Sequence, residues 1–273
     1  MNRITERFNQ LKREHRKGFI AYIGAGDPNL EATRQLAIGL DQAGVDVLEL
    51  GVPFSDPLAD GLTNQLAAQR GLASGTTPAK VLSTVAAIRH ESSIPIVLYL
   101  YFNLAFHYGL ERFIHDAAKA GVDGFLMLDL PPEESEDYEV LMRSAGLCTI
   151  RLVAPTTPPD RMAMIVKHCT GFVYYVSREG VTGVQDKVAA NIAPMTAQIR
   201  AHTDLPIAVG FGISTPEQAR LVAAHADAVV VGSAIVNQIA RCGQQSDLVP
   251  QVSAFVRVLA QAVKGSDSEN HPQ

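Results

Sequence analysis

Short apolar runs recur along the chain and predict β-strands separated by helices. The segments between the runs have helical periodicity: in 29–43, for example, apolar residues recur every three or four positions and Gly44 marks the end. Ser214 to Glu217 has the spacing of a capping box and predicts the start of a later helix. The eight predicted strands lie at 18–25, 45–51, 94–101, 124–129, 148–153, 171–176, 206–210 and 227–231.

The predicted strands are too evenly apolar for a sheet with one face in water. Apolar strands that are each followed by a helix are typical of a parallel sheet covered on both sides, and eight such units favour a closed (β/α)8 TIM barrel. An open, doubly wound sheet is the alternative. No break in composition divides residues 1–264, so we predict a single barrel domain there and a disordered polar tail at 265–273.

Composition narrows the class of protein. Of the 273 residues, 47% are hydrophobic and 19% charged, and the formal net charge is -5, which predicts a soluble globular protein without a nucleic acid partner. Residues 1–15 are polar and no run of about 18 apolar residues follows, so we expect no membrane span and a cytoplasmic location. Cys148, Cys169 and Cys242 are isolated from one another, as reduced thiols in the cytosol would be.

One glutamate stands out in the second predicted strand. Val47 and Glu49 share one side of this strand and Leu48 and Leu50 the other, so Glu49 points into the barrel if the leucines face helices. Burying an unpaired carboxylate costs several kcal/mol. Its position near the carboxyl end of the strand, where barrel enzymes carry their active sites, predicts a chemical role. A structurally paired glutamate is the alternative.

Two aspartates follow in the loop after this strand. Residues 51–61 read GVPFSDPLADG and place Asp56 and Asp60 at the same end of the barrel. Asp-Gly is also ordinary turn chemistry, so the residues alone leave the role of Asp60 open.

Glycines cluster after the last three predicted strands, in 180–183, 210–214 and 231–235. Each glycine alone is compatible with a tight turn. Together they occupy positions at which barrels bind a phosphate, beside the loops after strands seven and eight and the N-terminus of a short helix, which Ser233 would begin. We therefore predict a phosphate site at these loops.

Other classes of enzyme lack their signatures in this sequence. Gly24-Ala25-Gly26 has no third glycine of a dinucleotide fingerprint, and no Walker lysine motif occurs. A Schiff-base aldolase needs a lysine inside the barrel, whereas only Lys187, in a predicted loop, is conceivable. The histidines show no metal-ligand spacing, so we expect no metal and assign the acid and base work to carboxylates.

Four stretches together resemble the alpha subunits of tryptophan synthase over nearly the whole chain. They are AGDP at 25–28, LELGVPFSDPLADG at 48–61, DLPPE at 129–133 and YVSREGVTG at 175–183, of which the second is highly specific. The chain departs from the family at Ala21, where proline is usual, and at Gly24, where threonine or methionine is usual. Leu62-Thr63-Asn64 replaces proline, a variable residue and isoleucine.

The resemblance implies that Glu49 and Asp60 are the two catalytic carboxylates. It implies three further substrate contacts: Tyr174 near the glycerol portion, Thr182 on the loop after the sixth strand, and Phe211 beside indole. Its phosphate contacts agree with the glycine argument and fall to Gly183, Gly212, Gly232 and Ser233.

The implied reaction is the retro-aldol cleavage of indole-3-glycerol phosphate to indole and glyceraldehyde 3-phosphate in tryptophan biosynthesis. The indole ring, protonated at C3, serves as its own electron sink, so neither a Schiff base nor a metal is needed. Glu49 would move protons between the substrate hydroxyl and the ring carbon. Asp60 would accept a hydrogen bond from the indole N–H and stabilise the positive charge formed there.

The resemblance also implies a partner, the tryptophan synthase β subunit, in an α2β2 complex. The β subunit would carry pyridoxal phosphate and receive indole through a channel, whereas this chain would have no cofactor. The loops after strands two and six would communicate between the subunits. We expect the loop 177–190, which has little apolar content, to be mobile when the site is empty and ordered by substrate.

Three functions share this barrel: a partnered α subunit, a stand-alone indole-releasing lyase, and a weakly catalytic subunit that mainly activates its β partner. Steady-state rates with and without the β subunit would separate them. A phosphosugar isomerase barrel would explain the glycines and a central glutamate, but not the loop that carries Asp60.

Overall fold

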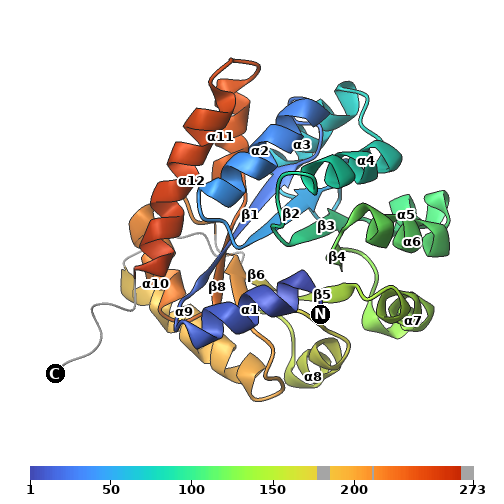
Figure 1. Cartoon of the computed structure of the whole chain (residues 1–273). Coiled ribbons are helices and arrows are strands. Elements are labelled where there is room, and N and C mark those ends of the chain that lie inside the picture. Colours follow the sequence, from blue (N-terminus) through green and yellow to red (C-terminus); the bar gives the residue numbers. More distant parts are fainter. Residues whose placement is uncertain (177–184, 211, 266–273) are drawn as a thin grey trace.

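Eight parallel strands close into a barrel in chain order, and the last strand pairs with the first (Figure 1). This computed structural model describes residues 1–176, 185–210 and 212–265, with the backbone alone described for 185–191. The predicted (β/α)8 barrel is confirmed, and each predicted strand overlaps an observed one. The strands are β1 (Gly18–Gly24), β2 (Val47–Gly51), β3 (Ile96–Leu100), β4 (Gly124–Met127), β5 (Cys148–Val153), β6 (Val173–Val176), β7 (Ile207–Gly210) and β8 (Ala228–Val231).

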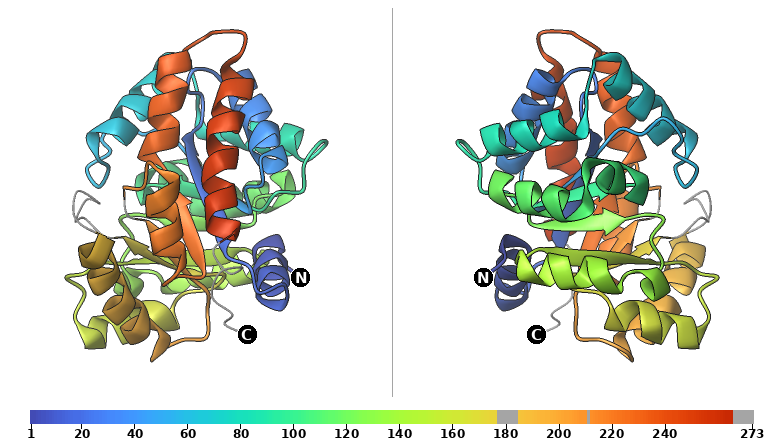
Figure 2. Two further views of the ribbon diagram at one scale, coloured as in Figure 1. Left: turned by 90° about the vertical axis from the view of Figure 1, so that its left-hand side faces the viewer. Right: turned by 90° about the vertical axis from the view of Figure 1, so that its right-hand side faces the viewer.

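Helices surround the strands (Figures 1 and 2). α2 (Leu30–Gln42) follows the predicted periodicity: the side chain of Asn29 caps its start by accepting from the Ala32 N–H, and Gly44, with φ 96°, lies just beyond its end. The other helices are α1 (Arg3–Arg13), α3 (Leu62–Ala73), α4 (Pro78–Ile88), α5 (Phe102–Tyr108), α6 (Leu110–Ala120), η1 (Pro132–Glu134), α7 (Glu136–Ser144), α8 (Pro159–Lys167), α9 (Gln185–Arg200), α10 (Pro216–Ala223), α11 (Ser233–Cys242) and α12 (Leu248–Lys264). None of the helices in the described part of the chain has the length and apolarity of a membrane span.

The capping box predicted at Ser214 to Glu217 lies one residue later. Thr215 is the N-cap of α10: its side chain accepts from the Gln218 N–H, and the Gln218 side chain accepts from the Thr215 N–H. The reason is Pro216, whose fixed φ suits the first helical position, so the cap falls on the residue before it. The predicted loop 177–190 includes residues that are helical, because α9 begins at Gln185. Residues 177–184 of that loop, and residues 266–273 of the tail predicted at 265–273, lie outside the described residues.

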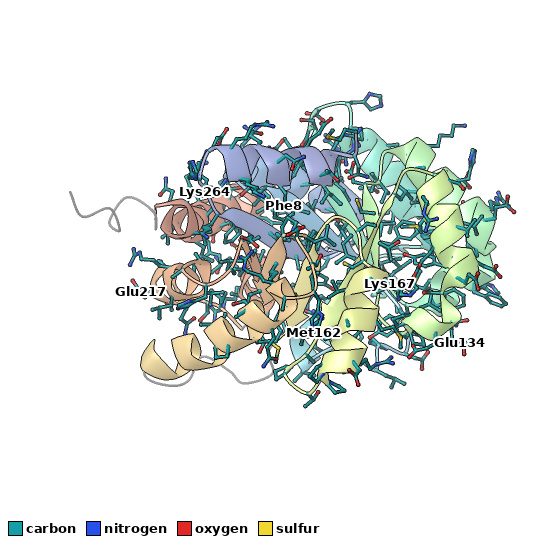
Figure 3. All side chains as sticks on the ribbon, turned by 90° about the horizontal axis from the view of Figure 1, so that it is seen from below. Phe8, Glu134, Met162, Lys167, Glu217 and Lys264 are labelled. Atoms are coloured by element: carbon teal, nitrogen blue, oxygen red, sulfur yellow. The ribbon has the colours of Figure 1, made fainter. Side chains whose placement is uncertain are left out.

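Apolar side chains pack on both sides of the strands, inside the barrel and beneath the helices. Figure 3 draws the side chains on the ribbon and labels Phe8 of α1. Val47 belongs to the cluster inside the barrel, whereas Leu48 and Leu50 pack between the strands and the helices. This confirms the predicted alternation in β2. Phe8 of α1 joins the inner cluster and packs against Phe172, so α1 closes the amino-terminal end of the barrel.

Polar side chains just before the even-numbered strands bind the start of the preceding strand. We call these four contacts the strand ties. In each tie a side-chain oxygen accepts a backbone N–H of an odd-numbered strand or of the residue at its start. The four are Asp46 with Phe19 (2.8 Å), Asp123 with Ile96 (2.8 Å), Thr170 with Thr149 (2.7 Å) and Asp227 with Ile207 (2.9 Å). They hold the strands in pairs at the amino-terminal end.

Basic side chains from helices pair with the three aspartates of the ties. Lys264, at the end of α12, lies 3.0 Å from Asp46, and Arg200, at the end of α9, lies 2.8 Å from Asp227. Asp123 pairs with Arg3 and Arg89, at 2.7 and 2.9 Å. The amino-terminal end of the barrel thus carries a network of charges that joins helices to strands.

Candidate active site

A cavity of about 210 Å³ opens at the carboxyl-terminal end of the barrel. Residues that are far apart in the sequence meet there, from β2, β6, the end of β8 and the loops after β2 and β7. The structure therefore brings together most of the site that the sequence predicts. The predicted residues that line the cavity are Glu49, Asp60, Tyr174, Gly212, Gly232 and Ser233.

Glu49 lies in β2 beside Tyr22 of β1 and Val97 of β3, and only 1% of it is exposed. Its Oε1 atom is buried without a hydrogen-bond partner among the described residues. Desolvation raises the pKa of Glu49 to about 8, because burial disfavours the charged form. At neutral pH Glu49 therefore carries a proton that it can donate, and afterwards it can accept one.

Asp60 is held by two tyrosine hydroxyls. Tyr99 donates to Oδ1 at 2.7 Å, and Tyr101 donates to Oδ2 at 3.0 Å. The Tyr101 hydroxyl also accepts from the Ala59 N–H at 2.9 Å, so it attaches the loop after β2 to the end of β3. Both oxygens of the carboxylate are thus oriented while each keeps a lone pair for a further donor.

Three tyrosines of this site, Tyr22, Tyr99 and Tyr101, were missed by the sequence analysis. Tyr22 packs edge-on against Tyr99, with ring centroids 5.0 Å apart. Burial raises the pKa values of Tyr22 and Tyr99 well above their ordinary value, and the nearby charge of Asp60 raises them further, so both hydroxyls keep their protons. The signal was available, because Tyr22 and Tyr99 have the inward parity of Ile20 and Val97.

Two glycines at strand ends make room for tyrosines of the cavity. A side chain at Gly51 would collide with the hydroxyl of Tyr22. A Cβ atom at Gly210 would lie 2.6 Å from the hydroxyl of Tyr174. Burial, followed by the charge of Glu49, raises the pKa of Tyr174 well above its ordinary value. Glycine is therefore needed at these two positions, because the rings of Tyr22 and Tyr174 occupy the space that a side chain would fill.

The other end of the cavity meets the start of α11. Gly232 is the N-cap of this helix and Ser233 its first residue, and the cap makes no side-chain hydrogen bond. The first N–H groups of a helix are free to bind an anion, and the helix dipole favours negative charge there. Gly212, with φ 63°, adopts a conformation that favours glycine. The predicted phosphate site is therefore built around an uncapped helix start.

Three predicted residues, Thr182, Gly183 and Phe211, lie outside the described residues. Their roles stay predictions. Among the residues that the structure does describe, no group of three or more His, Cys, Asp and Glu side chains could hold a metal ion.

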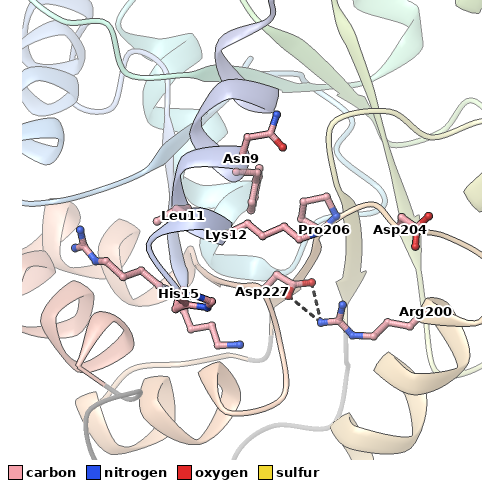
Figure 4. Close-up of a pocket in the computed structure, with 11 residues that line it drawn as sticks. Asn9, Leu11, Lys12, His15, Arg200, Asp204, Pro206 and Asp227 are labelled. Carbon is pink, nitrogen blue, oxygen red and sulfur yellow. Dashed lines mark hydrogen bonds and ion pairs between the residues drawn. The ribbon is translucent and has the colours of Figure 1, made fainter.

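A larger cavity, of about 760 Å³, lies at the opposite end of the barrel (Figure 4). Its walls come from α1, including Lys12, and from residues that precede β1, β7 and β8. The ion pair between Arg200 and Asp227 lies in this wall. Barrel enzymes carry their chemistry at the carboxyl-terminal end instead, so size alone does not make this cavity the active site.

A closed parallel barrel with two carboxylates and an uncapped helix start at its carboxyl-terminal mouth is the arrangement of a (β/α)8-barrel enzyme. Comparison with known proteins then identifies its family. The family model described as tryptophan synthase alpha chain matches residues 8–264. This chain belongs to the tryptophan synthase alpha chain family.

Individual relatives agree with the family model. A tryptophan synthase alpha chain of Opitutus terrae is 56% identical over 239 residues, which cover 88% of this chain and 90% of that protein. One of Geobacter sp. strain M21 is 48% identical over 97% of this chain and 100% of that protein. The crystal structure of tryptophan synthase subunit alpha from Legionella pneumophila is 38% identical and superposes with a TM-score of 0.89, over 96% of this chain and 98% of that one.

Proposed function

We propose that this protein cleaves indole-3-glycerol phosphate to indole and glyceraldehyde 3-phosphate, the alpha reaction of tryptophan synthase. Its family makes it a carbon–carbon lyase of tryptophan biosynthesis. The observation that carries the assignment to this cavity is a pair of carboxylates: Glu49 is buried with an unpartnered oxygen, and Asp60 is held by two tyrosine hydroxyls. Both face a space that ends at an uncapped helix.

Glu49 moves the protons in this proposal. Its carboxyl group is protonated at neutral pH and gives that proton to C3 of the indole ring. The resulting carboxylate takes the proton of the hydroxyl on the carbon next to the ring. The bond between this carbon and C3 then breaks, the hydroxyl oxygen becomes the aldehyde oxygen, and the electron pair of the broken bond restores the aromatic ring.

Asp60 stabilises the charge that develops between these two proton transfers. Protonation at C3 places positive charge on the ring nitrogen, whose N–H can donate to a carboxylate oxygen of Asp60. Tyr99 and Tyr101 fix the carboxylate before substrate binds, so little reorganisation is needed during the reaction. An interaction that strengthens as charge develops accelerates the chemical step more than it strengthens binding.

The phosphate of the substrate binds at the start of α11 in this proposal, against backbone N–H groups at Gly212, Gly232 and Ser233. The resemblance to the family adds Gly183 to this set. It also assigns Tyr174 to the glycerol portion, Thr182 to the loop after β6 and Phe211 to the indole ring.

None of these steps needs a cofactor, so we infer that pyridoxal phosphate belongs to the β subunit. The family implies a β-subunit partner, and we propose an α2β2 complex. Three large apolar side chains are exposed on segments that follow β2 and β3: Leu58 (93% exposed), Leu62 (70%) and Phe106 (66%). Such residues are typical of an interaction surface. The cytoplasmic location expected from the sequence stays a prediction.

Indole formation by the purified protein tests the proposal. We expect Glu49→Gln to lower kcat by about 100- to 10,000-fold, the usual effect of losing a general acid–base group. Asp60→Asn should lower kcat strongly and change KM less. Asp56→Asn, in the same loop but exposed, is the matched control and should keep the parent rate without a β subunit. Near-parent turnover by folded Glu49→Gln protein would refute the assignment.

A further inference from the structure

Asn64 is a second residue of the cavity with a buried acceptor that lacks a donor. Its Oδ1 atom is buried without a hydrogen-bond partner among the described residues, as is Oε1 of Glu49, and both residues line the same cavity. Buried polar atoms in native proteins are almost always paired, with protein groups or with water, and an exception needs an explanation. Two such acceptors in one cavity indicate that its ligand brings donors.

The side chain of Asn64 is not used to build its own helix. Asn64 is the third residue of α3, whose N-cap, Gly61, makes no side-chain hydrogen bond. Its backbone N–H already donates to the Gly61 carbonyl at 3.0 Å. The helix therefore leaves the side-chain oxygen of Asn64 available to a ligand.

The neighbours of α3 place Asn64 between the two ends of the cavity. Ala67 lies three residues further along the helix and thus on the same side, and it packs in one buried cluster with Tyr22 and Val236. Val236 in turn lies three residues after Ser233 in α11. Asn64 therefore lies between Asp60, where we place the indole ring, and Ser233, where we place the phosphate.

We propose that Asn64 determines specificity by accepting a hydrogen bond from the substrate hydroxyl next to the phosphate-bearing carbon. The inference rests on the proposed function. The substrate chain has two hydroxyls, and the one beside the ring gives its proton to Glu49. The other takes no part in bond breaking and lies between the ring and the phosphate, as Asn64 does. It is a donor that needs an acceptor, and Asn64 supplies one.

Binding of two small phosphates tests this contact without the reaction. sn-Glycerol 1-phosphate has the hydroxyl in question in the configuration of D-glyceraldehyde 3-phosphate, and 3-hydroxypropyl phosphate lacks only that hydroxyl. We expect the parent protein to bind the first about fivefold more tightly by calorimetry, the usual net effect of one hydrogen bond. Asn64→Leu, similar in size, should abolish this preference. Asn64→Asp should weaken both phosphates by charge repulsion but keep the preference, and Thr63→Val, the matched control, should change neither.

An equal preference in the parent and in Asn64→Leu, with thermal unfolding showing both to be folded, would overturn the role of Asn64 alone. Indole formation by the parent would in that case still support the proposed function. Failure of the parent to bind either phosphate would overturn the phosphate site and this inference with it. Loss of the preference in Asn64→Leu and its retention in Asn64→Asp would support the contact.

Discussion

At the scale of single residues, Glu49 links activity and stability through one proton. The proposed reaction needs the carboxyl group of Glu49, which the barrel buries. At neutral pH this carboxyl is buried in its neutral form, because desolvation raises its pKa to about 8. A well-packed apolar side chain at this position would suit the barrel better. The cost of burying the carboxyl should therefore be measurable in the protein without substrate.

Glu49→Gln should remove the pH dependence that this residue gives to stability. In the unfolded chain Glu49 titrates near its ordinary value of 4.5, and in the folded protein near 8, so between these values only the folded state holds the proton. Parent stability is therefore lost as pH rises through this window, and the variant gains on the parent by about 1.4 kcal/mol per pH unit. Urea unfolding from pH 5 to 9 measures this difference.

The gain should level off above pH 8, where both states of the parent have lost the proton. Glu134→Gln, an exposed substitution on η1, serves as the control and should show no such trend. A difference between Glu49→Gln and the parent that stays constant with pH would mean that Glu49 is ionised in the folded protein.

The two tyrosines that hold Asp60 should differ in their effects. Tyr99→Phe removes one donor from the carboxylate and leaves the loop attached, so we expect kcat to fall about tenfold with KM nearly unchanged. Tyr101→Phe removes a donor and also the contact with Ala59, so kcat and KM should both change. Steady-state indole formation distinguishes the two. A rise in KM alone for Tyr99→Phe would count against its role in orienting Asp60.

At the scale of elements, the strand ties separate stability from chemistry. They lie at the amino-terminal end of the barrel, opposite the cavity that holds Glu49 and Asp60. Asp123 is one of the two most buried aspartates of the ties: its side chain is 3% exposed, as is that of Asp46, and it pairs with Arg3 and Arg89. Desolvation lowers the pKa of Arg89 to about 10, and the charge of Asp123 opposes this effect. The carboxylate of Asp123 therefore stabilises the charged form of Arg89 against burial.

Asp123→Ala should destabilise the fold by about 3–5 kcal/mol, because it leaves the charge of Arg89 buried and unpaired. Asp227→Ala is the matched comparison: it removes the same kind of tie, but its side chain is 30% exposed, so we expect a smaller loss. Urea unfolding gives both values. Both variants should form indole at the parent rate per folded molecule. If Asp123→Ala and Asp227→Ala lose the same stability, burial does not explain the strength of the Asp123 contact.

The sequence predicts the elements well because apolar runs and glycine stops are local signals. All eight strands and the inward direction of Glu49 followed from them. The capping box was misplaced by one residue, since two adjacent hydroxyl residues precede Pro216 and only the proline decides between them. The hydrogen bonds from Tyr99 and Tyr101 to Asp60 could not be predicted, because they depend on how closely the end of β3 approaches the loop after β2.

At the scale of the whole molecule, the exposed side chains of Leu58, Leu62 and Phe106 lie at the same end as the chemistry. Leu58 lies two residues before Asp60, and Phe106 belongs to the helix that follows β3. A partner that covers this end would touch the elements that hold Asp60. Family membership makes the β subunit the expected partner, so binding and catalysis should be coupled.

Phe106→Asp should weaken the complex with the β subunit at least tenfold, because it would bury an unpaired charge in the interface. Phe106 is 66% exposed and outside the loop of Asp60, so indole formation by the isolated chain should not change. Val258→Asp on α12 is the matched control, at 53% exposed. Sedimentation velocity gives the affinity and the stoichiometry. Equal affinity of Phe106→Asp and Val258→Asp would place the interface elsewhere.

The strand ties also decide where this chain could be cut in two. Each tie joins an odd-numbered strand to the even-numbered one after it, so the barrel consists of four fastened pairs. A cut between residues 145 and 146 separates the second pair of strands from the third and leaves both partners of every tie in the same fragment. A break at residue 109 puts Ile96 and Asp123 on different pieces. Fragments 1–145 and 146–273 should therefore reassemble into an active barrel more readily than fragments divided within a pair.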